Sequence, residues 1–259
     1  MSRQVRHPMA TISMFGISHF HRRNPYIVAW WSAAYPGFGH YLLNQYARAT
    51  VLTLIEVTVN TLAHVNESIV YTLCGDFEKA GLVLKPEWAC GYLVIYFFAI
   101  WDSFRSTLMQ NKLCHIAEIE NNPVCTVYLH PLEIQYLEQK NPFPAVWYSI
   151  LLPGLGQLYN HRFVLAFYAM FWWGFYSIMS HAYESAFYLL TGNLQQAVSV
   201  LNIHWLLFLP SVLCGATYHA FITVIEHNRL YRMEQRRYLM ERYGNNEVQL
   251  FPSGGLTNC

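Results

Sequence analysis

A pattern of side chains that can do acid–base or metal chemistry occurs twice in this chain. His-x-x-Glu-Ser-x-x-Tyr begins at His64 and again at His181. On a helix, positions i, i+3 and i+7 lie within about 60° of one another, so each histidine shares a stripe with its glutamate, Glu67 or Glu184. Two imidazoles and two carboxylates that converge form a ligand set that zinc, iron or manganese accepts. The pattern predicts a shared divalent-metal or proton site. Hydrogen bonding between the two segments, or solvated positions at a membrane surface, are the alternatives.

Three further polar side chains fall within apolar segments: Glu56, Asp102 and His219. A carboxylate in hydrocarbon is costly, so Glu56 is expected to face a bundle interior, a cavity or a partner protein. There it either relays protons or is held by a hydrogen bond, for example to Asn60. The sequence has no Gly-rich phosphate loop, nucleophile elbow or His-Glu-x-x-His motif, so no catalytic set indicates an enzyme.

The repeated pattern belongs to a longer internal duplication. When the chain is shifted against itself by 117 positions, two long stretches align without a gap. The matched residues include Asn24-Pro25 with Asn141-Pro142, Trp30 with Trp147, Gly75 with Gly192, Trp88 with Trp205, and Asn111-x-Leu113 with Asn228-x-Leu230. Self-similarity at a fixed offset indicates a tandem repeat, and residues that both copies keep are the best pointer to function.

Composition places these repeats in a bilayer. Hydrophobic residues make up 54% of the chain and charged residues only 12%, which is too few to cover a soluble domain. Four segments of about 20 residues can each cross about 30 Å of hydrocarbon. They are Leu42–Leu62, Gly91–Phe104 (extended to 86–109), Phe163–Met179 and Trp205–Ile225. Two shorter runs, Tyr26–Tyr35 and Phe143–Leu152, are interpreted as interfacial helices rich in Trp and Tyr; six spans is the alternative.

Basic residues indicate the orientation. Only Lys79 and Lys85 fall in the loops after the long helices, and the others lie in the amino-terminal segment, near helix starts, in the linker or in the tail. Both termini are therefore expected in the cytoplasm, with the plasma membrane as the location. Two spans per copy make the copies parallel, related by a pseudo-two-fold axis along the membrane normal. The predicted fold is thus an all-α, multi-pass helical membrane protein. Its predicted parts are an amino-terminal segment 1–23, repeat 24–122, linker 123–140, repeat 141–243 and flexible tail 244–259.

Local signals add detail to each copy. Arg105–Asn122 and Glu226–Tyr243 are expected to continue the second span of each copy as cytoplasmic helix. Asp76 and Asn193 are expected to cap a short outer helix, following glycines that suit the end of the preceding helix. The near-neutral net charge of +1 gives no reason to expect a nucleic-acid partner.

A Pro-Gly-x-Gly turn follows the short apolar run in each copy. Proline ends a helix, and the glycines allow a tight turn with close backbone approach. Gln157 can hydrogen-bond to backbone groups left unpaired at the turn, and Tyr159 and Arg162 can anchor at the membrane interface. The turn residues are Pro36, Gly37 and Gly39 in the first copy and Pro153, Gly154, Gly156, Gln157 and Tyr159 in the second. The second run resembles the Pro-Gly-x-Gly-Gln-x-Tyr turn of the bacterial two-transmembrane-helix domain superfamily. The first copy departs from it, with His40 in place of Gln157.

That resemblance implies a membrane hairpin and, for function, an assembly or regulatory module. We therefore expect an integral membrane protein that acts as a non-enzymatic scaffold, assembly or regulatory subunit. Its expected partners are membrane lipid and a membrane or cytoplasmic protein. No cofactor is expected apart from the possible divalent metal. The alternative is a small transporter or channel for an ion, proton or metal, whose pathway between the repeats uses Glu56, Asp102 and His219.

Overall fold

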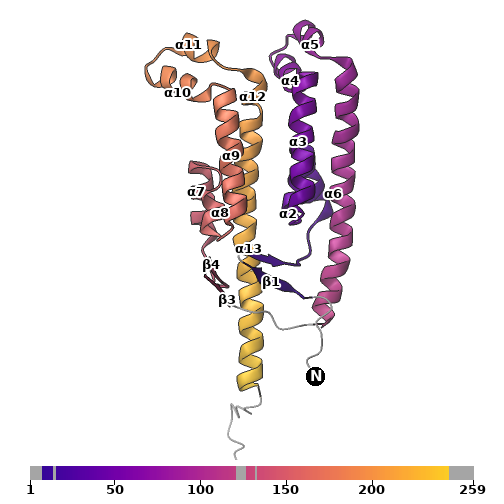
Figure 1. The fold of residues 1–259 in the computed structure, drawn as a ribbon, viewed down its shortest axis with the longest axis vertical. Coiled ribbons are helices and arrows are strands. Elements are labelled where there is room, and N and C mark those ends of the chain that lie inside the picture. Colours follow the sequence, from indigo (N-terminus) through magenta and orange to yellow (C-terminus); the bar gives the residue numbers. More distant parts are fainter. Residues whose placement is uncertain (1–7, 14–15, 121–126, 132, 245–259) are drawn as a thin grey trace, which may run out of the picture.

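The computed structural model describes residues 8–13, 16–120, 127–131 and 133–244, and its chain is mostly helical (Figure 1). The predicted end of the first helical extension at Asn122 and nearly all of the predicted tail lie outside the described residues. The first half begins with α1, which starts at Pro25 behind an Asn24 side chain that accepts the Tyr26 N–H, as expected of an N-cap followed by proline. Its helices are α1 (Pro25–Ala34), α2 (Phe38–Leu42), α3 (Tyr46–Ala63), α4 (Val65–Leu73), α5 (Phe77–Val83) and α6 (Pro86–Glu120).

The second half repeats this order of helices. Its helices are α7 (Pro142–Leu151), α8 (Leu155–Tyr159), α9 (Phe163–Met179), α10 (Ala182–Leu190), α11 (Leu194–Ser199), α12 (Ile203–Leu206) and α13 (Phe208–Tyr243). The starts of α7 to α11 lie 117 residues after those of α1 to α5, so the offset that aligns the sequence also aligns the helix boundaries. α12 starts 117 residues after α6, but a break at Leu207 separates it from α13.

Hydrogen bonds recur at the same offset. The Asn111 side chain accepts the Arg23 N–H (2.9 Å) and donates to the Arg23 carbonyl (2.8 Å). The Asn228 side chain makes the same two bonds to Lys140, at 2.8 Å and 2.6 Å. Each asparagine thus ties the chain entering the first short helix to the long last helix of its half. This explains why both copies keep an asparagine there.

One β-hairpin precedes the helices of each half, and neither hairpin was predicted from the sequence. β1 (Ala10–Ser13) pairs antiparallel with β2 (Gly16–His19), and β3 (Val127–His130) pairs antiparallel with β4 (Glu133–Tyr136). These strands too are separated by 117 residues, although few of their residues are identical. Parts of the predicted amino-terminal segment and linker are therefore ordered strands.

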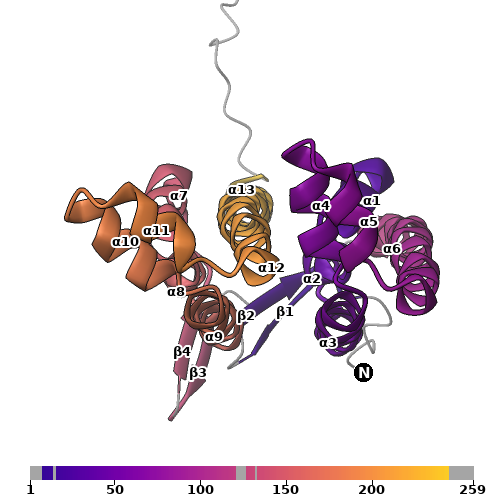
Figure 2. The same ribbon diagram turned by 90° about the horizontal axis from the view of Figure 1, so that it is seen from above.

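The two halves stand side by side with their long helices roughly parallel (Figure 1). The short helices α4, α5, α10 and α11 gather at one end, and the hairpins lie near the other, where α13 extends farthest. Seen from above, α13 occupies the middle, between the rest of its own half and the first half (Figure 2). Aromatic contacts join the halves: the hydroxyls of Tyr35 and Tyr176 are 2.7 Å apart, and Trp31 packs against Tyr218 with ring centroids 4.8 Å apart.

Fewer helices than predicted meet the requirements of length and apolarity for a membrane span. Within the described residues, one helical segment meets both requirements without a partner: the run Ile203–Tyr243, which joins α12 and α13. The number rises to three if two bent pairs, α5–α6 (90°) and α9–α10 (68°), each form one span. The helix α3, which contains most of the predicted first span, is not among them. It starts at Tyr46, because the short helix α2 and a turn occupy the residues before it.

The predicted extensions and caps are present. α6 runs on to Glu120 and α13 to Tyr243. Asp76 accepts the Lys79 N–H at the start of α5, and Asn193 accepts the Gln196 N–H at the start of α11. Gly75 and Gly192 both adopt positive φ after the preceding helix, as that turn requires.

Candidate functional site

The His-x-x-Glu pairs lie at bends rather than within one long helix. His64 (φ 56°) separates α3 from α4, and His181 (φ 55°) stands between α9 and α10, both in the left-handed region. Each histidine contacts its own glutamate: His64 Nδ1 is 3.1 Å from Glu67, and His181 Nδ1 is 3.3 Å from Glu184. The predicted continuous helical stripe is therefore interrupted at the histidine.

The two pairs do not form one metal-binding group. Among the described residues, the one set of three or more His, Cys, Asp or Glu side chains close enough to share an ion lies elsewhere. His64 instead lies beside His204 of the second half, with ring centroids 6.3 Å apart, while about half of the His181 side chain is exposed. The geometry supports a local contact between each histidine and its own glutamate.

Glu56, Asp102 and His219, the three polar residues predicted to lie within spans, each contact side chains nearby. Glu56 accepts hydrogen bonds from Asn60 (3.0 Å) and Tyr92 (3.2 Å). Asp102 contacts His40 and Arg48, both at 3.0 Å. The His219 Nδ1 atom lies 3.4 Å from the hydroxyl of Thr223, one turn further along α13.

The Pro-Gly-x-Gly turns fasten a short helix to the long helix of the same half. Gly37 and Gly154 have positive φ, which a proline-terminated helix needs in order to reverse. A Cβ atom at Gly39 would lie 2.6 Å from the Val28 carbonyl oxygen, and one at Gly156 would lie 2.4 Å from the Ala145 carbonyl oxygen, so only glycine allows this approach.

The residue after the second glycine completes the attachment. Gln157 is buried and donates to the Ala216 carbonyl of α13 (2.8 Å), and His40 of the first half reaches Asp102 of α6 instead. Tyr159 donates to the Asn141 carbonyl (3.4 Å). The prediction that Arg162 anchors at the membrane interface is wrong, because Arg162 is buried, with only 5% of its surface exposed.

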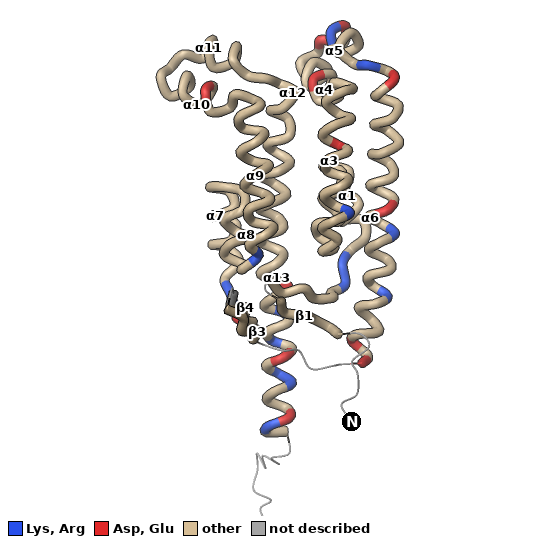
Figure 3. Tube along the Cα trace, viewed as in Figure 1, with Lys and Arg blue, Asp and Glu red and all other residues tan. Residues whose placement is uncertain are grey.

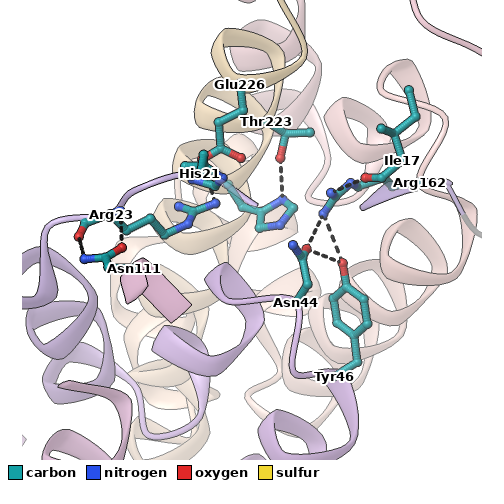
Figure 4. Close-up of polar contacts among 10 residues, drawn as sticks. Ile17, His21, Arg23, Asn44, Tyr46, Asn111, Arg162, Thr223 and Glu226 are labelled. Atoms are coloured by element: carbon teal, nitrogen blue, oxygen red, sulfur yellow. Dashed lines mark hydrogen bonds and ion pairs between the residues drawn. The ribbon is translucent and has the colours of Figure 1, made fainter. Parts of the chain in front are cut away.

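Arg162 instead connects three segments inside the molecule (Figure 4). Its guanidinium donates to the Ile17 carbonyl of β2 (2.8 Å), to Asn44 Oδ1 (3.1 Å) and to the Tyr46 hydroxyl (3.0 Å). All three acceptors belong to the first half, so this buried cation joins the turn of the second half to the first. The β1–β2 hairpin is thereby docked onto the opposite half, where Ile17 also packs with Leu230.

Beside Arg162 lies a cluster of titratable side chains that the sequence analysis missed. His19 ends β2, and His21 and Arg23 follow at every second position of the extended chain that leads to α1. His21 and Arg23 both contact the carboxylate of Glu226 on α13, with Arg23 Nη2 at 2.6 Å (Figure 4). The ring of His227, also buried, lies 5.9 Å from that of His19. We call His19, His21, Arg23, Glu226 and His227 the hairpin–α13 cluster.

Burial sets the charge state of this cluster. It lowers the pKa of His19 to about 3, helped by the nearby Arg23 and Arg162 and opposed by Glu226. His19 is therefore a neutral imidazole at physiological pH, with one ring nitrogen free to accept a hydrogen bond or bind an ion. Burial also lowers the pKa of Arg23, which the carboxylate of Glu226 opposes. The arginine therefore stays charged and paired.

No family model matches this chain, and no curated protein or solved structure resembles it significantly. The resemblance of its turns to two-transmembrane-helix domains accordingly stays a prediction.

One signal in the sequence could have pointed to the cluster. His19-Phe20-His21 is a His-x-His pattern, which puts two imidazoles on one face when the chain is extended. The residues around it mix apolar, polar and basic side chains without a long alternating run, so they gave no reason to expect a strand. Its partner Glu226 was assigned to a charged helical extension, so nothing in the sequence paired the two.

Proposed function

We propose that this chain is a multi-pass integral membrane protein of two tandem, parallel repeats related by a pseudo-two-fold axis along the membrane normal. It acts as a non-enzymatic scaffold, assembly or regulatory subunit of a membrane complex. The observation that carries this proposal is the local pairing of the three intramembrane polar residues. They stabilise the bundle, and each has partners that a conduction pathway would have to displace.

The distribution of charge supports placement in the plasma membrane with both termini in the cytoplasm. α9 and the first half of α13, through Ile225, contain no Lys, Arg, Asp or Glu. Lys and Arg gather beyond them, toward the hairpin end of the molecule and along the protruding end of α13 (Figure 3). At about 1.5 Å per residue, the 36 residues of α13 extend about 54 Å, well beyond a hydrocarbon core of about 30 Å.

The protruding end of α13 is the surface that best fits a protein partner. Arg232, Arg236 and Arg237 alternate there with exposed apolar side chains, of which Leu239 and Met240 are each about half exposed. Apolar groups that protrude beyond both the membrane and the body of the protein are typical of an interaction surface.

The transporter alternative has less support. One cavity between the halves has a volume of about 60 Å³, room for about two water molecules. Its walls include His219 and aromatic side chains such as Tyr35 and Trp172, but neither Glu56 nor Asp102. The three polar residues therefore do not line this cavity together.

Purification of the full chain in mild detergent tests the proposal. A stoichiometric protein that co-purifies with the wild type, and is lost with Leu239→Glu, supports a subunit role. Leu190→Glu is the matched control, because Leu190 is also exposed but lies on α10 at the opposite end.

A flux assay provides the opposing result. Liposomes that contain the purified chain alone should pass protons or divalent ions no faster than empty liposomes. Flux that depends on Glu56 or Asp102 would establish the transporter alternative and refute the subunit role.

A further inference from the structure

Part of the hairpin–α13 cluster has the composition and spacing of a metal site. His19 Nδ1 or Nε2, His21 Nδ1 or Nε2 and a Glu226 carboxylate oxygen offer ligand atoms that all lie within 4.8 Å of one another. Two imidazoles and one carboxylate are a common ligand set for zinc and for iron(II). Ligands at about 2.0–2.2 Å from a tetrahedral centre lie about 3.3–3.6 Å apart, so rotamer shifts of an ångström or so would close the site.

A second observation also points to a missing ligand. The Nδ1 atoms of His19 and His21 are buried and have no hydrogen-bond partner among the described residues, and the same holds for His227 Nε2. Buried polar atoms in folded proteins are nearly always paired, and each exception needs an explanation such as an ion or water. Several unpaired imidazole nitrogens around one carboxylate are accounted for together by a single cation.

We propose that His19, His21 and Glu226 bind one divalent transition-metal ion of the zinc or iron(II) type. The ion joins the amino-terminal hairpin of the first half to α13 of the second. It thus acts as a structural clamp between the halves. This proposal does not depend on the subunit role, and it places a metal in a different part of the molecule from the repeated His-x-x-Glu pairs.

Arg23 sets the character of the site. Its guanidinium is paired with one oxygen of the Glu226 carboxylate. A carboxylate has two oxygens and about four lone-pair positions, so acceptor positions remain for an ion. The adjacent positive charges of Arg23 and Arg162 oppose a second cation. Binding is therefore expected to be exchangeable rather than irreversible.

The test uses the full-length chain in detergent, stripped with a chelator and then titrated with Zn²⁺ against a metal-sensitive dye. The wild type should bind one Zn²⁺ per chain, and His19→Gln and Glu226→Gln should each weaken binding at least 100-fold. His181→Gln is the matched control, since it removes an exposed histidine beside a glutamate, and it should bind as the wild type does.

A spectroscopic variant keeps the test decisive if the other variants fold poorly. One equivalent of Co²⁺ bound to His21→Cys should give a thiolate-to-cobalt charge-transfer band in the near ultraviolet, which the wild type at one equivalent should lack. No stoichiometric Zn²⁺ on the wild type would overturn the proposal. So would unchanged binding in folded His19→Gln and Glu226→Gln, or loss of binding in His181→Gln.

Discussion

Replacing Gly156 by alanine tests whether the Pro-Gly-x-Gly turn is fixed by backbone contact. The added Cβ would lie 2.1 Å from Ser149 Oγ, 2.4 Å from the Ala145 carbonyl oxygen and 2.7 Å from Ala220 Cβ. The Ser149 hydroxyl can rotate away, but a backbone carbonyl and a Cβ on α13 move only if whole helices separate. The turn would have to open by about 1 Å to restore ordinary contact at about 3.4 Å.

The expected cost follows from two opposing terms. Overpacking of this kind costs about 1–3 kcal/mol, and with two unyielding neighbours the upper end applies. Alanine has a higher helix propensity than glycine by about 1 kcal/mol, which offsets part of that cost. The net loss is about 2 kcal/mol, or a fall in Tm of about 4–8 °C for a chain of this size.

Gly174 supplies the matched control. It lies within α9, and a Cβ there would meet nothing within 4 Å. Gly174→Ala should therefore raise Tm by up to about 2–4 °C, because only the gain in helix propensity remains. Gly39→Ala, which places a Cβ 2.6 Å from a backbone carbonyl in the first half, should behave as Gly156→Ala does.

The assay is thermal unfolding in detergent, followed by the fluorescence of the eight tryptophans. The change in Tm caused by alanine is expected to be negative at position 156 and positive at position 174. If Gly156→Ala melts at or above the wild-type temperature, or Gly174→Ala falls as far as Gly156→Ala, the close-contact explanation of the turn motif is wrong.

Three further predictions concern charge. Arg162→Met should lower stability by about 3 kcal/mol, because the buried Ile17 carbonyl and the partly exposed Asn44 and Tyr46 side chains lose a charged donor; an unchanged Tm would show that the arginine does not join the halves. Arg23→Gln should tighten Zn²⁺ binding at least tenfold in the dye titration, because the guanidinium competes with the ion for one carboxylate; weaker binding would contradict that competition. Hydrogen bonds lower the pKa of the Asp76 carboxyl, so its capping of α5 is present above the unfolded pKa and is lost as pH falls through the folded value. Hydrogen exchange should show α5 losing protection below about pH 4, while α11, capped by the non-titrating Asn193, keeps it; equal loss in both helices would assign the effect to something other than the cap.

Much of the helical framework could be predicted, because it depends on local signals. Asn24-Pro25 and Asn141-Pro142 mark helix starts by capping and by the fixed φ of proline, and both helices begin there. The predicted span Phe163–Met179 coincides with α9. The predicted start at Leu42 was wrong, because the α2 turn is held by contacts to other helices, among them Asp102, which no local pattern reveals.

The candidate site could not be predicted, since its members come together only in the folded chain. The spacing of His64 and Glu67 predicted a stripe on one helix, but the left-handed conformation at His64 bends the chain there. Histidine adopts that conformation more readily than most residues, so the sequence is compatible with the bend but contains no pattern that predicts it. The contact of Glu226 with His21 depends instead on a hairpin that crosses to the other half.

The crossing of the β1–β2 hairpin also has a consequence for biosynthesis. The ribosome makes His21 before Glu226, which follows about 200 residues later. At about 5–20 residues per second, about 10–40 s pass before the hairpin's docking surface exists. The hairpin is therefore made well before the helix on which it docks, and a chain released before α13 is complete keeps the hairpin undocked. Such a segment gives the cell's proteases a ready means of distinguishing an unfinished protein from a finished one.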